Sequence, residues 1–210
     1  MVRIKICGIT NPEDALLAAD LGAQALGFIF YPKSPRSIKP DAARDIIKIL
    51  PPFVLSVGVF VDEAAEVVRE LAATVGLDWV QLHGQESPEY CRAVGRRVIK
   101  GFRIRDHSSL AALPSYRNAV QAFLLDAYRP GTHGGTGETF DWEVARGAQE
   151  FGPVILAGGL TAANVAQAIN AAQPAGVDVA SGVEAAPGKK DPESLREFFE
   201  AVERTVIGYQ

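Results

Sequence analysis

The stretch PVILAGGLTAANVAQAINAAQPAGVDVASG, residues 153–182, decides the fold that the sequence predicts. It contains two apolar runs of strand length, at 153–159 and 176–182, and both end in glycine. Between them, 161–173 has the spacing of an amphipathic helix that begins at Thr161. Two strands joined by a helix lie parallel, because a parallel neighbour needs a crossover of about a dozen residues or more. The stretch therefore predicts one β–α–β unit of a parallel sheet.

The same unit recurs along the whole chain. Helix-like segments with their own start signals include 11–22, with Asn11 as N-cap, 62–76, where Asp62 and Glu63 favour the positive end of the helix, and 191–206. Six further strand-like runs lie at 2–7, 25–30, 53–60, 78–84, 97–102 and 122–127. Eight strand–helix units without a linker predict an α/β fold: a single-domain (β/α)₈ TIM barrel over residues 1–210, with eight parallel strands and outer helices. An open doubly wound sheet is the alternative, since periodicity does not show whether a sheet closes.

Composition and charge limit the classes of partner. A formal net charge of −4 and a pI near 5.4 give no basic footprint for nucleic acid or an anionic membrane. No apolar run approaches the roughly 20 residues that span a bilayer, and the first strand begins at residue 2, so a cytoplasmic protein is expected. The two cysteines form neither a disulfide framework nor a zinc cluster. A small-molecule partner and no metal site are expected.

In such a barrel the catalytic groups follow the strands, at their carboxyl ends. Cys7 ends the first run, on the same alternating face as Arg3 and Lys5. An isolated free cysteine is more often a small buried apolar residue than a functional thiol, so its position alone leaves both interpretations open. Asp126 ends the sixth run after AFLL, and a carboxylate at the end of a buried strand needs a partner or a task.

The last two strands end in loops that favour a phosphate site. Gly158 and Gly159 stand in LAGGLTAANV, and Ser181 and Gly182 stand in VASGVEAAPG. Small residues let backbone N–H groups approach an anion closely, and the loops after strands seven and eight are a frequent phosphate site of this fold. One glycine pair can serve only a tight turn, whereas two pairs on adjacent loops favour phosphate binding.

Four further residues near strand ends are candidates for the same pocket. Arg36, in YPKSPRS, is either a solvated surface charge or a guanidinium that grips a carboxylate. His83 is interpreted as a hydrogen-bonded wall of the pocket, and no metal site is expected there, because its loop contains no second histidine. Arg103 follows the fifth run, and Gly135 lies in the GGTG segment at 134–137.

Together, these stretches resemble phosphoribosylanthranilate isomerase, the barrel enzyme of tryptophan biosynthesis. Each motif is weak alone, but their order and spacing are highly specific. Two departures from the family pattern are ASGVE in place of SSGVE, with Ala180 before Ser181, and Glu138 within GGTGETF. The resemblance is carried by KICGIT, GFIFYPKSPRSI, VGVFVD, VQLHGQES, LLDAY, GGTGETFDW, LAGGLTAANV and GVDVASGVE followed by PGKKD.

The resemblance implies a cofactor-free Amadori rearrangement of N-(5-phosphoribosyl)anthranilate to 1-(2-carboxyphenylamino)-1-deoxyribulose 5-phosphate, a phosphosugar isomerisation by general acid/base catalysis. Carried onto this sequence, it implies that Cys7 is the general base, that Asp126 is the general acid and that Arg36 binds the anthranilate carboxylate. The loops of Gly158–Gly159 and Ser181–Gly182 match the family's phosphate site. The sequence leaves the oligomeric state open, with a homodimer as one possibility.

The chemistry sets two expectations for the side chains. Opening the ribose ring needs a proton on the ring oxygen, so Asp126 is expected to have a raised pKa. Removing the C2 proton from the resulting iminium needs a thiolate, so the pKa of Cys7 is expected to lie below its free value of about 8.5. Lys5 would lower that pKa if it faces inward, as a second cation at the mouth or as a filler of the barrel interior.

Two other functions are consistent with parts of the pattern. A neighbouring phosphosugar isomerase of histidine biosynthesis would use a pair of aspartates as acid and base, whereas the first strand here ends in cysteine. A phosphate-binding barrel without catalysis would bind the ligand and would be insensitive to Cys7→Ser and Asp126→Asn.

Overall fold

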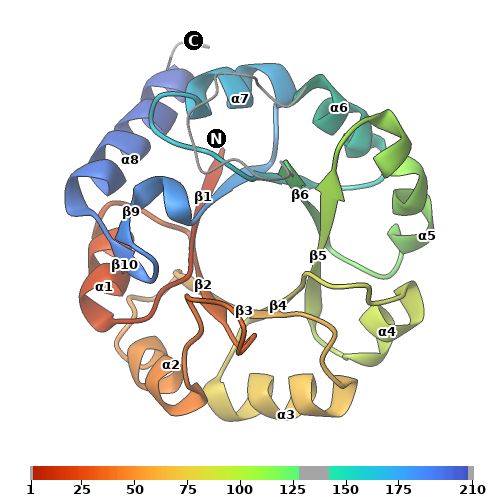
Figure 1. The fold of residues 1–210 in the computed structure, drawn as a ribbon, viewed down its shortest axis with the longest axis horizontal. Helices are drawn as coiled ribbons and strands as arrows, with labels where there is room; N and C mark the ends of the chain where they lie inside the picture. The colour runs from red at the N-terminus through yellow and green to blue at the C-terminus, as the bar shows by residue number, and fades with distance from the viewer. Residues whose placement is uncertain (1, 128–141, 208–210) are drawn as a thin grey trace.

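Eight parallel strands close into a barrel in the computed structural model, which describes residues 2–127 and 142–207 (Figure 1). The strands follow their sequence order around the barrel, and β1 pairs with β8 to close it, with Lys5 opposite Asp178. The predicted (β/α)₈ barrel is confirmed, and the open doubly wound sheet is wrong. The strands are β1 (Arg3–Cys7), β2 (Ala25–Ile29), β3 (Leu55–Phe60), β4 (Trp79–Leu82), β5 (Arg97–Ile104), β6 (Ala122–Ala127), β7 (Val154–Ala157) and β8 (Gly176–Val179).

Several strands end at other residues than the predicted runs. β4 ends at Leu82 and β8 at Val179, so that His83, Ser181 and Gly182 lie beyond their strands. β7 stops at Ala157, because Gly158 and Gly159 have φ of 88° and 65°, a left-handed backbone that does not continue a strand. β5 extends to Ile104, so Arg103 lies within this strand rather than after it. Arg103 is directly opposite Asp126 of β6 in the strand register.

A ring of helices surrounds the barrel, as Figure 1 shows. Between β8 and the last helix, a short hairpin of β9 (Glu184–Ala186) and β10 (Lys189–Lys190) is added to the regular pattern. The α-helices are α1 (Pro12–Asp20), α2 (Pro40–Ile47), α3 (Ala65–Val75), α4 (Pro88–Ala93), α5 (Leu113–Tyr116), α6 (Trp142–Gly147), α7 (Val165–Ala172) and α8 (Pro192–Ile207), and the 3₁₀ helices are η1 (His107–Ala112), η2 (Ala148–Glu150) and η3 (Ser181–Val183).

Two of the predicted helix starts are confirmed. Asn11 Oδ1 accepts a hydrogen bond from the Asp14 N–H at 2.8 Å, which caps α1 ahead of Pro12. Asp191 Oδ1 accepts one from the Ser194 N–H, also at 2.8 Å, at the start of α8. Each cap satisfies a backbone donor that has no partner within its own helix.

The other two starts are wrong by a few residues. α3 begins at Ala65, so Asp62 and Glu63 precede it, and Asp62 Oδ1 instead accepts from the Gln85 N–H at 2.6 Å. α7 begins at Val165, because Thr161 forms a turn in which its N–H donates to Asn164 Oδ1 at 2.8 Å. In both places an acidic or amide side chain binds the backbone of a loop, which competes with helix formation.

The apolar core has two layers. The larger one lies between the strands and the helices and includes Ile4, Ile6 and Phe28. The smaller one fills the barrel interior and consists of Val57, Ile99, Ala122, Leu124 and Ala157. On β1, the alternation places Ile4 and Ile6 against the helices and turns Lys5 and Cys7 into the barrel.

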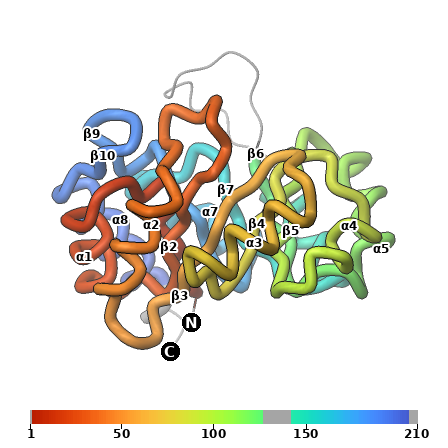
Figure 2. Tube along the Cα trace, turned by 90° about the horizontal axis from the view of Figure 1, so that it is seen from below, coloured from red at the N-terminus to blue at the C-terminus, as the bar shows by residue number. Residues whose placement is uncertain are grey.

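The two ends of the barrel differ in character. Charged side chains and glycine loops gather where the strands end. At the other end, the loop between α2 and β3 protrudes (Figure 2) and exposes Phe53 to 97%, with Ile49 and Leu55 also exposed. Among the described residues, no helix combines the length and the apolar character that crossing a membrane requires.

Candidate active site

Cys7 lies at the carboxyl end of β1 and faces the barrel interior beside Lys5. Gly27 of β2 makes room for both side chains, because a Cβ there would lie 2.7 Å from the Cys7 Sγ and 3.1 Å from the Lys5 Nζ. The Lys5 ammonium donates to Asp178 Oδ1 at 2.7 Å, and both partners are buried. Lys5 is therefore an interior cation in an ion pair, and the thiol, which is 6% exposed, lies next to that pair.

The charges around Cys7 act in opposite directions. Burial raises the pKa of the thiol, Lys5 lowers it and Asp178 raises it, so that the pKa lies above its ordinary value. For Lys5, burial lowers the pKa of the ammonium, but Asp178 and Cys7 raise it by more, which keeps the group protonated. The expectation of a thiol pKa below its ordinary value is thus wrong for these surroundings, because burial and Asp178 outweigh Lys5.

Asp126 lies at the end of β6, and β7 and β8 separate this strand from β1. Its side chain is 34% exposed, and its Oδ2 lies 3.4 Å from the His83 Nε2. The His83 Nδ1 lies 3.2 Å from the Gln81 Nε2. A Cβ on Gly101 would lie 2.5 Å from the same Nδ1, so this glycine makes room for the imidazole. Gln81 therefore lies next to one ring nitrogen of His83 and Asp126 next to the other.

Arg36 lies between the end of β1 and the β9–β10 hairpin. Its Nε donates to both carboxylate oxygens of Glu184, at 2.9 and 3.0 Å, and its Nη2 donates to Oε2 at 2.8 Å. Gly8 has φ of 78°, and a Cβ there would lie 2.8 Å from the Arg36 Cδ. This glycine therefore satisfies a turn and leaves room for the arginine. Arg36 is not a solvated surface charge, because it is held in a fork by a buried carboxylate.

The two glycine loops lie against each other. A Cβ on Gly182 would lie 1.8 Å from the Leu160 carbonyl oxygen, a distance that no real Cβ can adopt. Gly182 therefore allows the loop after β8 to contact the loop after β7, which carries Gly158 and Gly159. Ser181 begins η3 directly after Ala180. Both loops follow the strands that lie between Cys7 and Asp126.

The structure brings most of the predicted site residues to one end of the barrel. Cys7, Asp126 and His83 lie at strand ends there, and Arg36 reaches the same end from its loop. Arg103 is exposed and lies beside Asp126 in the neighbouring strand, inside β5 rather than beyond it. Gly135 lies outside the described residues.

Several charged residues of this end were not singled out from the sequence. Glu184 and Lys190 stand in the quoted motifs GVDVASGVE and PGKKD, and their signal is a charge in an otherwise small and apolar stretch after the last strand. Asp178 is a carboxylate inside a buried strand, which requires a partner. In the predicted closed barrel β1 lies beside β8, so Lys5 was a candidate for that partner.

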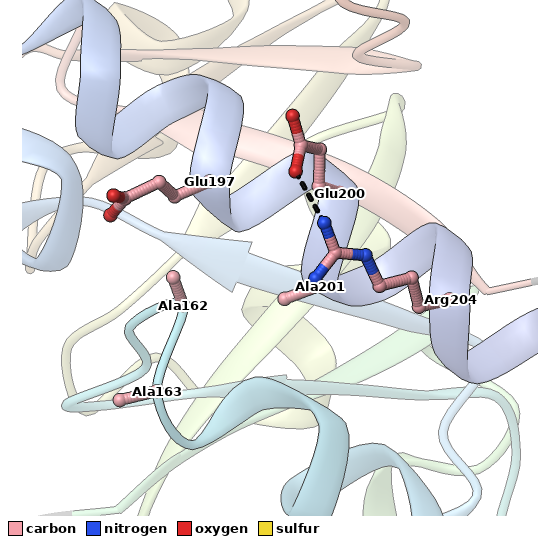
Figure 3. Close-up of a pocket in the computed structure, with 6 residues that line it drawn as sticks. All are labelled: Ala162, Ala163, Glu197, Glu200, Ala201 and Arg204. Carbon is pink, nitrogen blue, oxygen red and sulfur yellow. Dashed lines mark hydrogen bonds and ion pairs between the residues drawn. The ribbon is translucent and has the colours of Figure 1, made fainter.

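A separate hollow lies on the outside of the barrel, between the loop after β7 and α8 (Figure 3). On its rim, Arg204 donates to Glu200 Oε2 at 2.7 Å, and both side chains are exposed. None of the predicted site residues lines it. The lining residues are Ala162, Ala163, Glu197, Glu200, Ala201 and Arg204.

A closed barrel whose strand ends carry a thiol, a carboxylate and two glycine loops defines the class of (β/α)₈-barrel enzymes with a site at the carboxyl end of the strands. The family model described as N-(5'phosphoribosyl)anthranilate (PRA) isomerase matches residues 4–201. The chain belongs to this family.

Individual relatives are similar over nearly the whole length. The N-(5'-phosphoribosyl)anthranilate isomerase of Pelobacter propionicus is 57% identical over 205 residues, which cover 98% of this chain and 97% of that one. A crystal structure of phosphoribosyl anthranilate isomerase in complex with reduced 1-(o-carboxyphenylamino)-1-deoxyribulose 5-phosphate has a TM-score of 0.88 and 43% identity, and the alignment covers 97% of this chain and 100% of that one. A structure of monomers made from the dimeric Thermotoga maritima enzyme has a TM-score of 0.87 and 42% identity, with the same coverage.

Proposed function

We propose that this chain catalyses the Amadori rearrangement of N-(5-phosphoribosyl)anthranilate to 1-(2-carboxyphenylamino)-1-deoxyribulose 5-phosphate, a step of tryptophan biosynthesis. The observation that carries the proposal is that Cys7 and Asp126 end two strands at the same end of the barrel, in a chain of this family. The relative that is described with a bound reduced form of that product supports the same reaction. One catalytic domain spans residues 1–210.

Asp126 is the general acid in this proposal. Its carboxyl group is partly exposed, so it can reach the substrate and exchange protons with water. It gives a proton to the oxygen of the ribose ring, the C1–O bond breaks, and the nitrogen lone pair forms a C1–N double bond. The product of this step is a cationic iminium. His83, 3.4 Å from the carboxylate, fixes the orientation of the acid.

Cys7 is the general base. It removes the C2 proton, and the electron pair of that bond moves toward the iminium to give the enolamine, which tautomerises to the ketone. The pKa of Cys7 lies above its ordinary value, mainly through burial, so the thiolate needs a further positive charge beside Lys5. The iminium cation supplies that charge at the step in which the base acts, since a neighbouring cation favours the thiolate.

The anionic ends of the substrate have separate partners. The glycine loops that carry Gly158–Gly159 and Ser181–Gly182 bind the phosphate through backbone N–H groups. Arg36 binds the anthranilate carboxylate with the edge of its guanidinium that Glu184 does not occupy. With the two ends held, the ribose lies between Cys7 and Asp126.

The test is turnover of freshly prepared phosphoribosylanthranilate, followed by the loss of its anthranilate fluorescence. We expect the wild-type protein to convert this compound and to leave the phosphosugar substrate of the related histidine-pathway isomerase unchanged. A wild-type protein that is inert on phosphoribosylanthranilate would contradict the proposal. Tight binding of a product analogue without turnover would instead favour a binding barrel.

The protein also forms a homodimer in this proposal, through the end of the barrel opposite the site. The loop between α2 and β3 exposes Phe53 to 97%, with Ile49 and Leu55 beside it in the chain. Several large apolar side chains exposed in one short segment are typical of protein interfaces, and the Thermotoga maritima relative is described as dimeric. Sedimentation should give a dimer for the wild type and a monomer of equal kcat for Phe53→Ser. A monomeric wild type would contradict the dimer.

In this proposal the protein is cytoplasmic, as a biosynthetic role implies. Cell fractionation of the source organism tests this location, and recovery of the protein in the membrane fraction would contradict it.

A further inference from the structure

Three charged side chains converge behind the strand end that carries Cys7. They are Arg36, Glu184 of β9 and Lys190 of β10, and they form one continuous cluster. Glu184 accepts from Arg36 as described above and lies 3.0 Å from the Lys190 Nζ. The side chain of Glu184 is 4% exposed and that of Lys190 is 0% exposed. Such burial of charge is costly unless every group is paired, so the cluster calls for an explanation.

Lys190 connects three separate segments through one ammonium group. Its Nζ donates to the Cys7 carbonyl at 2.7 Å, to the Ala180 carbonyl at 3.1 Å and to Glu184 Oε1 at 3.0 Å. Three acceptors match the three N–H bonds of a protonated lysine. Cys7 carries the proposed base, and Ala180 directly precedes the Ser181–Gly182 loop.

Glu184 uses one edge of the Arg36 guanidinium. The Nε and Nη2 atoms both bind its carboxylate, which leaves the edge between Nη1 and Nη2 for a second carboxylate. The fork also fixes the plane of the guanidinium, so less rotamer freedom remains to be lost on binding.

The sum of the charges explains why a second cation is buried here. A Glu184–Arg36 pair alone would be neutral and would attract an anion weakly. With Lys190 the cluster contains two cations and one anion, so that the cluster as a whole has one net positive charge. Burial raises the pKa of Glu184, but Arg36 and Lys190 lower it by more, so that this carboxylate stays ionised near neutral pH.

We propose that Glu184 and Lys190 are positioning residues of the isomerase. Glu184 orients Arg36 toward the substrate carboxylate. Lys190 connects Glu184 to the end of β1, which carries Cys7, and to Ala180, which precedes the Ser181–Gly182 loop. The inference rests on the function proposed above. The competing explanation is that the cluster only fastens the β9–β10 hairpin to the barrel. The hairpin has other anchors, since the Lys190 N–H donates to Asp14 Oδ2 at 2.7 Å and the Thr10 hydroxyl donates to the Gly188 carbonyl.

The first experiment is a double-mutant cycle of Glu184→Gln and Arg36→Met, read as KM and kcat. Each single variant should raise KM for phosphoribosylanthranilate by about 10- to 100-fold, the value of a lost hydrogen bond to a charged group, with kcat little changed. Because Glu184 acts through Arg36, the double variant should show no further increase in KM.

The second experiment compares Lys190→Met with Lys189→Met, its exposed neighbour on β10. Lys190→Met should raise KM, since the net positive charge of the cluster is lost, and should also lower kcat, since the Cys7 carbonyl loses its donor. Lys189→Met should leave both constants at the wild-type values. If Glu184→Gln does not fold, Glu184→Asp takes its place. This variant keeps the negative charge but moves the carboxylate away from Arg36 by the length of one methylene group.

The outcomes separate the two proposals. Multiplicative effects in the double variant, or an unchanged KM in Glu184→Gln, would overturn the positioning role while wild-type turnover keeps the function intact. A Lys190→Met variant that loses only stability, with wild-type KM and kcat, would also overturn it. A wild-type protein without turnover would instead contradict the function itself.

Discussion

The two sides of the barrel mouth hold the proposed acid and base in different surroundings. Cys7 is 6% exposed and lies beside the buried pair of Lys5 and Asp178. The Asp126 side chain is 34% exposed and has His83 at 3.4 Å. An acid that must exchange its proton with water needs access, whereas a thiol base needs fixed charges that set its pKa. The difference teaches that one end of a barrel can supply both surroundings at once.

Both sides also contain a buried lysine–glutamate pair, but the partners differ. On the Asp126 side, the Lys100 Nζ lies 3.2 Å from Glu86 Oε2 and donates to the Gly84 carbonyl at 2.8 Å. Glu86 in turn accepts from the backbone N–H groups of Asp62 and Gly84, each at 2.9 Å. This pair therefore fixes the loops after β3 and β4.

On the Cys7 side, the corresponding pair binds a side chain instead. Glu184 holds the guanidinium of Arg36, and Lys190 binds the strand end itself. The same chemistry therefore stabilises loops on one side of the mouth and orients a proposed binding group on the other.

Removing either of the proposed proton-transfer groups should give the largest effect. Cys7→Ser replaces the thiol by a hydroxyl that does not ionise near neutral pH, and Asp126→Asn removes the acidic proton. Each should lower kcat by about 10²- to 10⁴-fold, with the urea midpoint near that of the wild type. Cys91→Ser, which changes a buried thiol on α4, is the matched control and should keep full activity. A fall in kcat of less than tenfold would show that the substituted residue does not transfer a proton in the reaction.

Breaking the pair on the Asp126 side should affect stability instead of binding. Lys100→Met leaves the Glu86 carboxylate buried without its cation, so the free energy of unfolding should fall by about 3–5 kcal/mol. Urea unfolding measures this loss, and KM of the folded variant should match the wild type. Lys48→Met, in an exposed pair with Asp45, should change stability by at most about 1 kcal/mol. A raised KM in Lys100→Met would contradict this prediction, because it would show that the Lys100–Glu86 pair also supports substrate binding.

The pH dependence sharpens the contrast further. Burial and Asp178 raise the pKa of Cys7 while Lys5 lowers it, so Lys5→Met should raise that pKa further. The thiolate forms as pH rises, so the rising limb of kcat/KM against pH should move to higher pH, with lower activity at neutral pH. The double variant Lys5→Met/Asp178→Asn should move the limb back toward the wild type. If the rising limb of Lys5→Met stays at the same pH as in the wild type, the group that titrates in this limb is not Cys7.

The smallest effect is expected at His83. It lies 3.4 Å from a carboxylate that is partly exposed, and such pairs contribute about 0.2–1 kcal/mol. His83→Asn should therefore lower kcat by less than about fivefold. Steady-state kinetics decide this, and a loss comparable to that of Asp126→Asn would make His83 a proton-transfer group rather than a support.

Much of the fold and of the site follows from local patterns. Strand-length runs alternate with capped helices, and parallel strands place all their carboxyl ends at one end of the sheet. That is why the sequence predicts that Cys7 and Asp126 lie at the same end of the barrel. Asn11 and Asp191 could be predicted as caps because each cap and the backbone N–H that donates to it lie within three residues.

The charged partners could not be predicted in the same way. Lys5 and Asp178 are 173 residues apart, and Arg36 and Glu184 are 148 residues apart. Their pairing depends on barrel closure and on the hairpin after β8, which periodicity does not encode. The expected direction of the Cys7 pKa is wrong for a related reason, since burial and the distant Asp178, which together outweigh the neighbouring Lys5, follow from the fold and not from the local sequence.

The most direct test of the central claim, that Asp126 opens the ring and Cys7 takes the C2 proton, is single-turnover kinetics with substrate deuterated at C2. In Cys7→Ser, cleavage of the C2–H bond should be the slowest step, so deuterium should give a full primary isotope effect. In Asp126→Asn, ring opening should be slowest, and the isotope effect should vanish. The reverse pattern, or equal isotope effects in the two variants, would contradict the assignment of acid and base.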